Sequence, residues 1–183
     1  MIDRRSFLAT AAAALALPGA AASALPSPNA EALLSLIGLP GIDGPPLAAS
    51  EIANRPVLIT FWASWCPPCR QEFAHFNLAH RKYGPQGLAT IGINVYEELD
   101  GLSNPAKRAR FLKQTVPEFR LVEAEPDILE VFGGVDRIPT VFLFDRQGEI
   151  AFMFVHDRGA KKQHVTFGEL RPALERLFPS SGS

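Results

Sequence analysis

The chain has 183 residues, of which 47% are hydrophobic and 20% charged, and its formal net charge is −1. These proportions are those of an ordinary one-domain globular protein. They exclude a disordered chain and a collagen-like repeat, and two cysteines are too few for a disulfide scaffold. Because Lys and Arg are balanced by Asp and Glu, no nucleic acid partner is expected.

The first 24 residues have the parts of an export signal. The pair Arg4-Arg5 precedes an apolar, Ala-rich stretch over residues 7–17, and small residues at 22–24 fit a signal peptidase. The pair followed by Ser-Phe-Leu resembles the twin-arginine type of bacterial signal, although Asp3 stands where that type has Ser or Thr. We expect removal of residues 1–24 and delivery to the periplasm. A general secretory signal and an uncleaved anchor are the alternatives.

After the signal we expect a leader over residues 25–40 and one domain over residues 41–179. An Asp-Gly turn within residues 42–47 indicates a hairpin or a capping segment ahead of the main sheet. Val57–Trp62 is a continuous β-branched and aromatic run, which is typical of a strand buried on both faces. From Pro67 to Tyr83 the apolar residues follow a helical period, and a Gly-Pro pair ends this predicted helix.

The second half of the domain continues the alternation of strands and helices. A strand is predicted over residues 88–95, followed by a helix over 105–114 with Asn104 as its cap. Alternating strands and helices, then a hairpin and a last helix, predict an α/β domain with a mixed sheet. The remaining predicted elements are a short strand at 119–122, a short helix at 126–132, strands at 141–144 and 150–155, and a final helix opened by a capping box at 166–169.

The strongest chemical signal is the Cys-Pro-Pro-Cys motif at residues 66–69, where the buried strand meets the helix. This spacing lets the two sulfurs meet across one helical turn, and the positive helix N-terminus favours a thiolate at Cys66, with Cys69 as the resolving thiol. A structural disulfide across so small a ring would stabilise the fold by only about 2 kcal/mol. A zinc site would need further ligands, and His75 and His80 follow the pair too closely on the same helix. We therefore interpret the pair as redox-active.

The segments Phe61–Glu72 and Arg137–Asp145 resemble the thioredoxin fold and, more narrowly, the TlpA/ResA-like branch of exported thiol–disulfide oxidoreductases. The resemblance covers residues 42–178 and implies a mixed β-sheet flanked by helices, with an N-terminal hairpin extension and a central insertion. It also implies that Pro139 is a cis proline beside the cysteines and that the backbone of Ile138 pairs with an incoming peptide. The residues expected to contact substrate are Trp65, Pro67, Pro68, Ile138 and Pro139.

One departure from ordinary thioredoxins concerns the proton relay beneath the cysteines. Those proteins keep an acidic residue where this chain has Thr60, whereas Glu72 lies three residues after Cys69, where similar proteins of the ResA type carry a glutamate. A half-buried carboxylate has a raised pKa and can accept the proton of Cys69. An exposed glutamate favoured by the helix dipole is the alternative. The expected catalytic residues are thus Cys66, Cys69 and Glu72.

The prolines between the cysteines bear on the direction of electron flow. Pro67 and Pro68 lack two backbone donors that could have stabilised a thiolate at Cys66, which favours a reductase over an oxidant. We expect a periplasmic disulfide reductase that needs no cofactor beyond its redox pair and no metal. Since the periplasm is oxidising, the resemblance implies a membrane electron donor of the DsbD or CcdA kind, with apocytochrome c or copper-site proteins as targets.

Two other activities remain open. A thiol oxidant or isomerase would share the motif, and a Cu(I) chaperone could use the same two thiolates. Such a chaperone would be expected to have a third ligand, Met or His, near the pair, and Met153 and His156 are remote from it in sequence. His156 and His164 lie in a charged stretch that we interpret as a solvated loop. Peroxidase chemistry is disfavoured because Ile59 and Ala63 stand where peroxiredoxins carry Pro and Thr or Ser.

Overall fold

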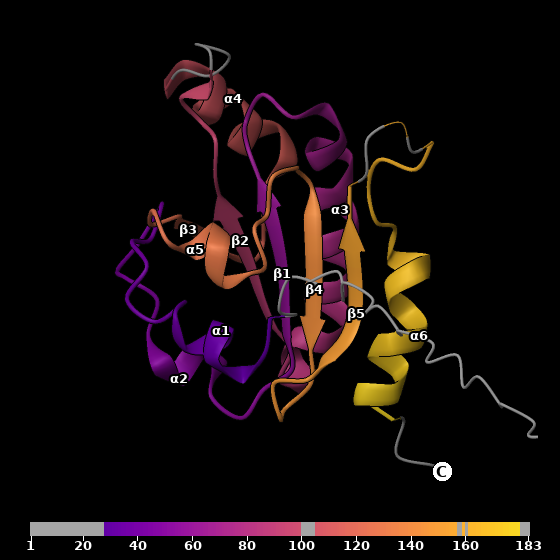
Figure 1. Ribbon diagram of the computed structural model, residues 1–183. Helices are drawn as coiled ribbons and strands as arrows, with labels where there is room; N and C mark the ends of the chain where they lie inside the picture. Colours follow the sequence, from indigo (N-terminus) through magenta and orange to yellow (C-terminus); the bar gives the residue numbers. More distant parts are fainter. Residues whose placement is uncertain (1–27, 100–104, 157–158, 160, 180–183) are drawn as a thin grey trace, which may run out of the picture.

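The computed structural model describes residues 28–99, 105–156, 159 and 161–179. Its strands are β1 Val57–Trp62, β2 Ala89–Asn94, β3 Arg120–Glu123, β4 Thr140–Phe144 and β5 Ile150–Val155. They form one sheet in the order β3-β2-β1-β4-β5 (Figure 1). β1 pairs in parallel with β2, and β2 with β3, whereas β4 is antiparallel to both β1 and β5. The predicted α/β class with a mixed sheet is confirmed.

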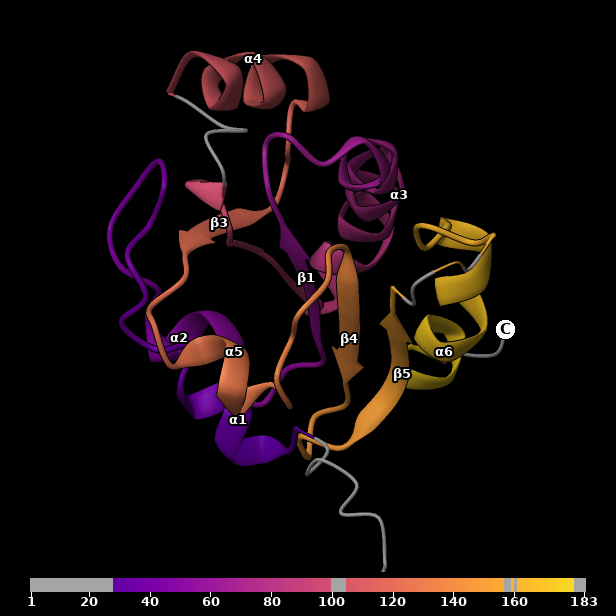
Figure 2. The same ribbon diagram turned by 45° about the horizontal axis from the view of Figure 1, so that its top comes forward.

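The helices cover both faces of this sheet. They are α1 Ala30–Leu34, α2 Ala49–Ile52, α3 Pro67–Tyr83, α4 Pro105–Thr115, α5 Ile128–Val131 and α6 Phe167–Leu177, with a 3-10 turn at Gly84–Gln86. Figures 1 and 2 show α3 and α6 side by side on one face, and α1, α2 and α5 gathered on the other. The predicted positions of β1 and α3 are confirmed, and the later elements lie within two residues of their predicted ranges.

The two faces of β1 carry different aromatic clusters. Because successive side chains of a strand point to opposite faces, Phe61 and Trp62 diverge. The ring of Phe61 meets that of Phe132, at the end of α5, edge-on with centroids 5.2 Å apart. The indole of Trp62 stacks on Phe111 of α4 at 4.8 Å and meets Phe73 of α3 edge-on at 5.1 Å. All six residues of β1 are therefore buried, as predicted for a strand covered on both faces.

The expected hairpin at residues 42–47 is wrong. The described chain instead makes one isolated antiparallel bridge there, between Gly41 and Val122. A hairpin ladder needs backbone N–H donors, and Pro45-Pro46 supplies none. The loop is closed by backbone hydrogen bonds of Leu47 with Gly38 and Leu39, and the guanidinium of Arg120 on β3 donates to the carbonyl oxygen of Pro45.

The N-terminal boundary also differs from expectation. Part of the expected leader over residues 25–40 is packed structure, because it forms α1 and buries Leu36 and Leu39 in the core. The predicted export signal at residues 1–24 and the predicted cap Asn104 lie outside the described residues. Within the part of the chain that the structure describes, no helix is long and apolar enough to span a membrane.

Candidate active site

The cysteine pair lies at the start of α3. Cys66 is the N-cap residue of the helix and forms a disulfide with Cys69, their Cα atoms 5.4 Å apart. The backbone N–H of Cys69 donates to Sγ of Cys66 over 3.2 Å, so a helix-terminal donor reaches this sulfur despite Pro67 and Pro68. Cys66 is 3% exposed and Cys69 is fully buried, which leaves Cys66 as the more accessible of the two.

Two residues that sequence analysis missed hold the loop leading into the pair. The carboxylate of Glu97 accepts from the backbone N–H and the hydroxyl of Ser64, over 2.6 and 2.8 Å. The indole N–H of Trp65 donates to the carbonyl oxygen of Tyr96 over 2.7 Å. Tyr96 has φ of +56°, a left-handed conformation that costs a non-glycine residue about 1 kcal/mol or more. The loop after β2, which contains Tyr96 and Glu97, is therefore strained at Tyr96. Its hydrogen bonds orient Ser64 and Trp65, which lead into the cysteine pair.

The peptide bond between Ile138 and Pro139 is cis, as the resemblance implied. The carbonyl oxygen of Ile138 lies 2.8 Å from Nδ1 of His156, and because a carbonyl can only accept, Nδ1 carries the hydrogen. The antiparallel register pairs Thr140 with Val155, which places the next residue, His156, opposite the cis proline. His156 is half-buried there, so its interpretation as part of a solvated loop is wrong.

The predicted substrate-contact residues are distributed over two hollows that meet at Trp65. A hollow of about 340 Å³ contains Trp65 and Ile138 in its lining, together with Tyr96, Leu99 and His156. A larger groove of about 680 Å³ is lined by Trp65 and Pro67. Pro68 is half-buried and Pro139 is buried, and neither is among the described residues that line these two hollows.

Glu72 is fully buried, whereas a half-buried side chain was expected, and the alternative of an exposed glutamate is wrong. The hydroxyl of Thr60 donates to one of its carboxyl oxygens over 2.6 Å, and the N–H of Val165 donates to the other over 3.0 Å. Burial raises the pKa of Glu72 to about 7, although these hydrogen bonds and the charge of Lys162 act against the rise. A carboxyl group with a near-neutral pKa, three residues from Cys69, can accept and return a proton.

The other histidines do not join this site. The imidazoles of His75 and His164 stack with their centroids 6.0 Å apart, and burial lowers the pKa of His75, as does the neighbouring His164. Met153 on β5 is 51% exposed. Among the residues described, no group of three or more His, Cys, Asp and Glu side chains could hold a metal ion.

The fold and the site together define a class of protein, the thioredoxin-fold proteins with a disulfide-forming Cys-Pro-Pro-Cys pair at a helix N-terminus and a cis proline. The chain belongs to the Redoxin family, whose model matches residues 21–169.

Comparison with known proteins finds similar sequences among thiol-disulfide oxidoreductases. The chain is similar to the thiol-disulfide oxidoreductase ResA of Bacillus subtilis (strain 168), with 26% identity over 109 residues. The match takes in 59% of this chain and 57% of ResA, so the chain spans less than two thirds of that relative's length. A match to ResA of Halalkalibacterium halodurans has 27% identity over 128 residues, 69% of this chain and 68% of that protein.

Solved structures give the same result. A putative thiol:disulfide interchange protein DsbE from Chlorobium tepidum has 28% identity and a TM-score of 0.59, covering 76% of this chain and 90% of that one. StoA from Bacillus subtilis, at 22% identity and a TM-score of 0.57, covers 75% of this chain and 94% of that one and is evidence of the fold alone. The thioredoxin fold and the resemblance to the TlpA/ResA-like branch are confirmed.

Proposed function

We propose that this protein is a thiol–disulfide oxidoreductase that reduces disulfides in target proteins. One observation carries the proposal: the Cys66–Cys69 pair at the start of α3 has a buried carboxyl group, that of Glu72, with a pKa near 7 on the next turn of the helix. A pair of this kind needs an accessible attacking thiolate, a shielded resolving thiol and a proton acceptor. Cys66, Cys69 and Glu72 fill these roles in that order.

The reaction begins with the pair reduced. The Cys66 thiolate attacks a sulfur of the target disulfide, whose S–S bond breaks as a mixed disulfide forms and one target thiolate leaves. Cys69 gives its proton to Glu72 and attacks the sulfur of Cys66, which breaks the mixed disulfide and releases the second target thiolate. Glu72 returns its proton to the released target. Two electrons have then passed from the pair to the target, and the pair is left as the disulfide.

The target would bind across the cis proline. An extended segment pairs its backbone with that of Ile138, in the manner of an added β-strand, while its side chains contact Trp65, Pro67, Pro68 and Pro139. The hydrogen bond from His156 to Ile138 supports this arrangement because it fixes the peptide group that the target pairs with.

The cellular setting follows from the N-terminal sequence. Residues 1–24 support export to the periplasm and removal of the signal. In that oxidising compartment the disulfide must be reduced again after each cycle, by a membrane electron donor of the DsbD or CcdA type. The proposed targets are the haem-attachment cysteines of apocytochrome c or the cysteines of copper-site proteins. No cofactor other than the redox pair takes part.

One observation favours the opposite direction of electron flow. The N–H of Cys69 donates to Sγ of Cys66, and a donor at this sulfur stabilises the thiolate and so makes the pair more oxidising. A thiol oxidant or isomerase is therefore the second candidate.

The reduction potential of the Cys66–Cys69 pair decides between them. The pair is equilibrated in glutathione or dithiothreitol buffers and read by the mass shift on thiol alkylation. A potential at or below about −220 mV supports the reductase, and a value near about −120 mV would establish an oxidant instead. Cys66→Ser and Cys69→Ser variants should both lose insulin-reducing activity. Full activity in both variants would refute the proposed oxidoreductase activity of this pair.

A further inference from the structure

The groove of about 680 Å³ beside the cysteine motif is strongly cationic. On one side it is lined by Trp65 and Pro67, the two residues that flank Cys66. Arg70 of α3 and Lys107 and Arg110 of α4 bring positive charge to its lining. Among the described residues that line it, three carry a positive charge and none a negative one. A target held at Cys66 therefore lies next to a concentration of positive charge.

The charge comes mainly from α4, the helix inserted between β2 and β3. Its eleven residues, all described, include four basic ones and no acidic one. The whole chain has a net charge of −1, so α4 is a local departure from the composition of the protein. Phe111 anchors this helix on Trp62, the last residue of the strand that leads to the cysteines, and so fixes the cations relative to the redox pair.

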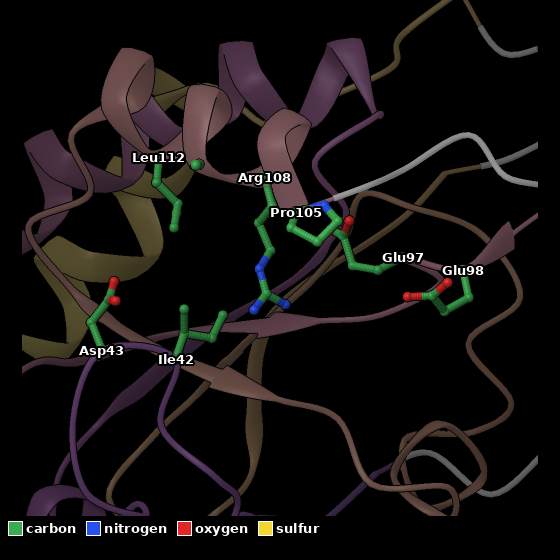
Figure 3. Close-up of a pocket in the computed structure, with 8 residues that line it drawn as sticks. Ile42, Asp43, Glu97, Glu98, Pro105, Arg108 and Leu112 are labelled. Atoms are coloured by element: carbon green, nitrogen blue, oxygen red, sulfur yellow. The ribbon is translucent and has the colours of Figure 1, made fainter.

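The basic residues of α4 are divided between two faces of the helix. Arg108 extends into a separate hollow of about 370 Å³, whose lining includes the carboxylates of Asp43, Glu97 and Glu98 (Figure 3). The guanidinium of Arg108 forms a 2.6 Å ion pair with Glu123 of β3. Residues three and seven positions apart share a helix face, so Lys107 and Arg110 turn toward the cysteine groove instead, together with Gln114. Arg108 thus pairs with an acidic residue of its own chain, and Lys107 and Arg110 line the groove.

Arg70 completes the groove from the other side. Its guanidinium lies 5.5 Å from the centroid of the Phe111 ring and donates to the side-chain oxygen of Gln114. These contacts hold the charge of Arg70 between α3 and α4, one helical turn from Cys66. Lys107 and Arg110, which line the groove from α4, both have exposed side chains.

We propose that this groove binds an acidic segment of the target polypeptide, a few residues from the disulfide that Cys66 attacks. The inference rests on the proposed disulfide exchange and adds a preference among targets. Complementary charge raises the rate of encounter and orients the partner, and salt weakens both effects. The groove would thus select targets by the sequence around their cysteines.

The test compares two synthetic peptides that each contain one intramolecular disulfide and differ only in having two Glu or two Gln residues beside it. The purified protein is reduced, separated from reductant and mixed with each peptide, and the single-turnover rate constant is measured. We expect the Glu peptide to react about tenfold faster at low salt, with the difference lost above about 0.5 M salt, where charges are screened within about 4 Å.

Variants assign the preference to the groove. The double variant Lys107→Gln with Arg110→Gln keeps only the charge of Arg70 in the groove, so it should lose most of the preference for the Glu peptide. Lys113→Gln, which changes the net charge of the same helix outside the groove lining, should keep the preference. The charge-reversed variant Lys107→Glu with Arg110→Glu should favour the Gln peptide.

The outcomes separate this inference from the proposed function. Equal wild-type rates for the two peptides, or an undiminished preference in the double variant, would overturn the acidic docking site and leave disulfide exchange intact. If Lys113→Gln lost the preference to the same extent as the double variant, the preference would be an effect of net charge. That result would overturn the groove as the origin of the preference. A wild-type protein that reduced neither peptide would refute the proposed function itself.

Discussion

The side chain of Glu72 is completely buried, and each of its carboxyl oxygens accepts a hydrogen bond. Burial disfavours the charged form, whereas the donors Thr60 and Val165 favour it. The balance brings the pKa of Glu72 to about 7. An acid or base works best when its pKa is close to the working pH, so this balance suits proton exchange with Cys69 at neutral pH.

Replacing Glu72 by Gln preserves the shape of the side chain and removes the proton acceptor. The base form of Glu72 is populated above a pKa of about 7, so the ratio of wild-type to Glu72→Gln rates should rise as pH increases through 7. We expect about a hundredfold difference above the pKa, about a tenfold difference one pH unit below it, and little difference two pH units or more below it. The measured step is release of the reduced target from the mixed disulfide, and a ratio independent of pH would contradict the assigned role.

Thr60 provides a matched control for this experiment. Its hydrogen bond lowers the pKa of Glu72, so Thr60→Val should raise that pKa further and move the inflection of the rate profile to higher pH. The profile should keep its height, because the proton acceptor is still present. An inflection unmoved by Thr60→Val would show that a group other than Glu72 titrates.

Among the secondary-structure elements, β2 makes room for the aromatic contact that anchors α4. At Gly92, a Cβ atom would lie 2.7 Å from Cδ2 of Leu121 and 3.1 Å from Nε1 of Trp62. The absence of a side chain at Gly92 therefore allows Trp62 to lie across β2 and stack on Phe111. This glycine is required by packing, since its φ is not in the left-handed region.

Substitution of Gly92 by Ala should overpack this layer and lower the free energy of unfolding by about 1–3 kcal/mol. Gly168 in α6 is the control, because its nearest heavy atom would be 3.9 Å from a new Cβ. There Ala should be neutral or raise stability by up to about 1 kcal/mol through its helix propensity. Urea unfolding of the oxidised proteins measures both, and equal stabilities of the two variants would contradict the packing argument.

For the molecule as a whole, two carboxyl groups give the free energy of unfolding opposite pH dependences. The pKa of Glu72, about 7 in the folded protein, is above its ordinary value of 4.5. The contribution of Glu72 to the free energy of unfolding is therefore fully present below about pH 4.5 and is lost as pH rises through about 7. Burial would also raise the pKa of Glu169, but hydrogen bonds from Lys162 and Thr166 outweigh burial and lower it to about 2. The contribution of Glu169 is present above pH 4.5 and is lost as pH falls through about 2.

Stability should therefore be greatest in mildly acidic solution. We expect the free energy of unfolding to fall by about 3 kcal/mol between pH 5 and pH 8 because of Glu72, at about 1.4 kcal/mol for each unit of its pKa shift. The Glu72→Gln variant should lack this decline. Urea unfolding at a series of pH values measures the effect. A wild-type free energy of unfolding that rose toward pH 8 would refute the assignment of this pH dependence to Glu72.

Elements fixed by local chemistry could be predicted from the sequence. The apolar run of β1 and the helical period of α3 suffice for their positions. The carboxylate of Glu169 accepts from the backbone N–H of Thr166, as in a capping box, and also from the hydroxyl of Thr166. The cis bond at Pro139 could be inferred through family resemblance, because its local sequence would also suit an ordinary strand start.

The parts that escaped prediction depend on contacts between distant residues. Glu97 and Ser64 are 33 positions apart, and the contact between His156 and Ile138 depends on the register of β4 against β5. The complete burial of Glu72 involves a contact with Val165, which is 93 positions away in the chain. Because the local sequence does not reveal this contact, only a half-buried position was expected for Glu72. Neither composition nor periodicity encodes such pairings.

The contact between Glu72 and Val165 gives the proposed proton transfer a spectroscopic reporter far from the cysteines in sequence. The amide of Val165 donates to an oxygen whose charge changes when Glu72 takes up a proton, so its NMR chemical shift should titrate with the pKa of that carboxyl group. A backbone amide is present in every variant, and Val165 is itself no participant in disulfide exchange. Its resonance would therefore show where the proton resides in the oxidised protein, the reduced protein and a trapped mixed disulfide.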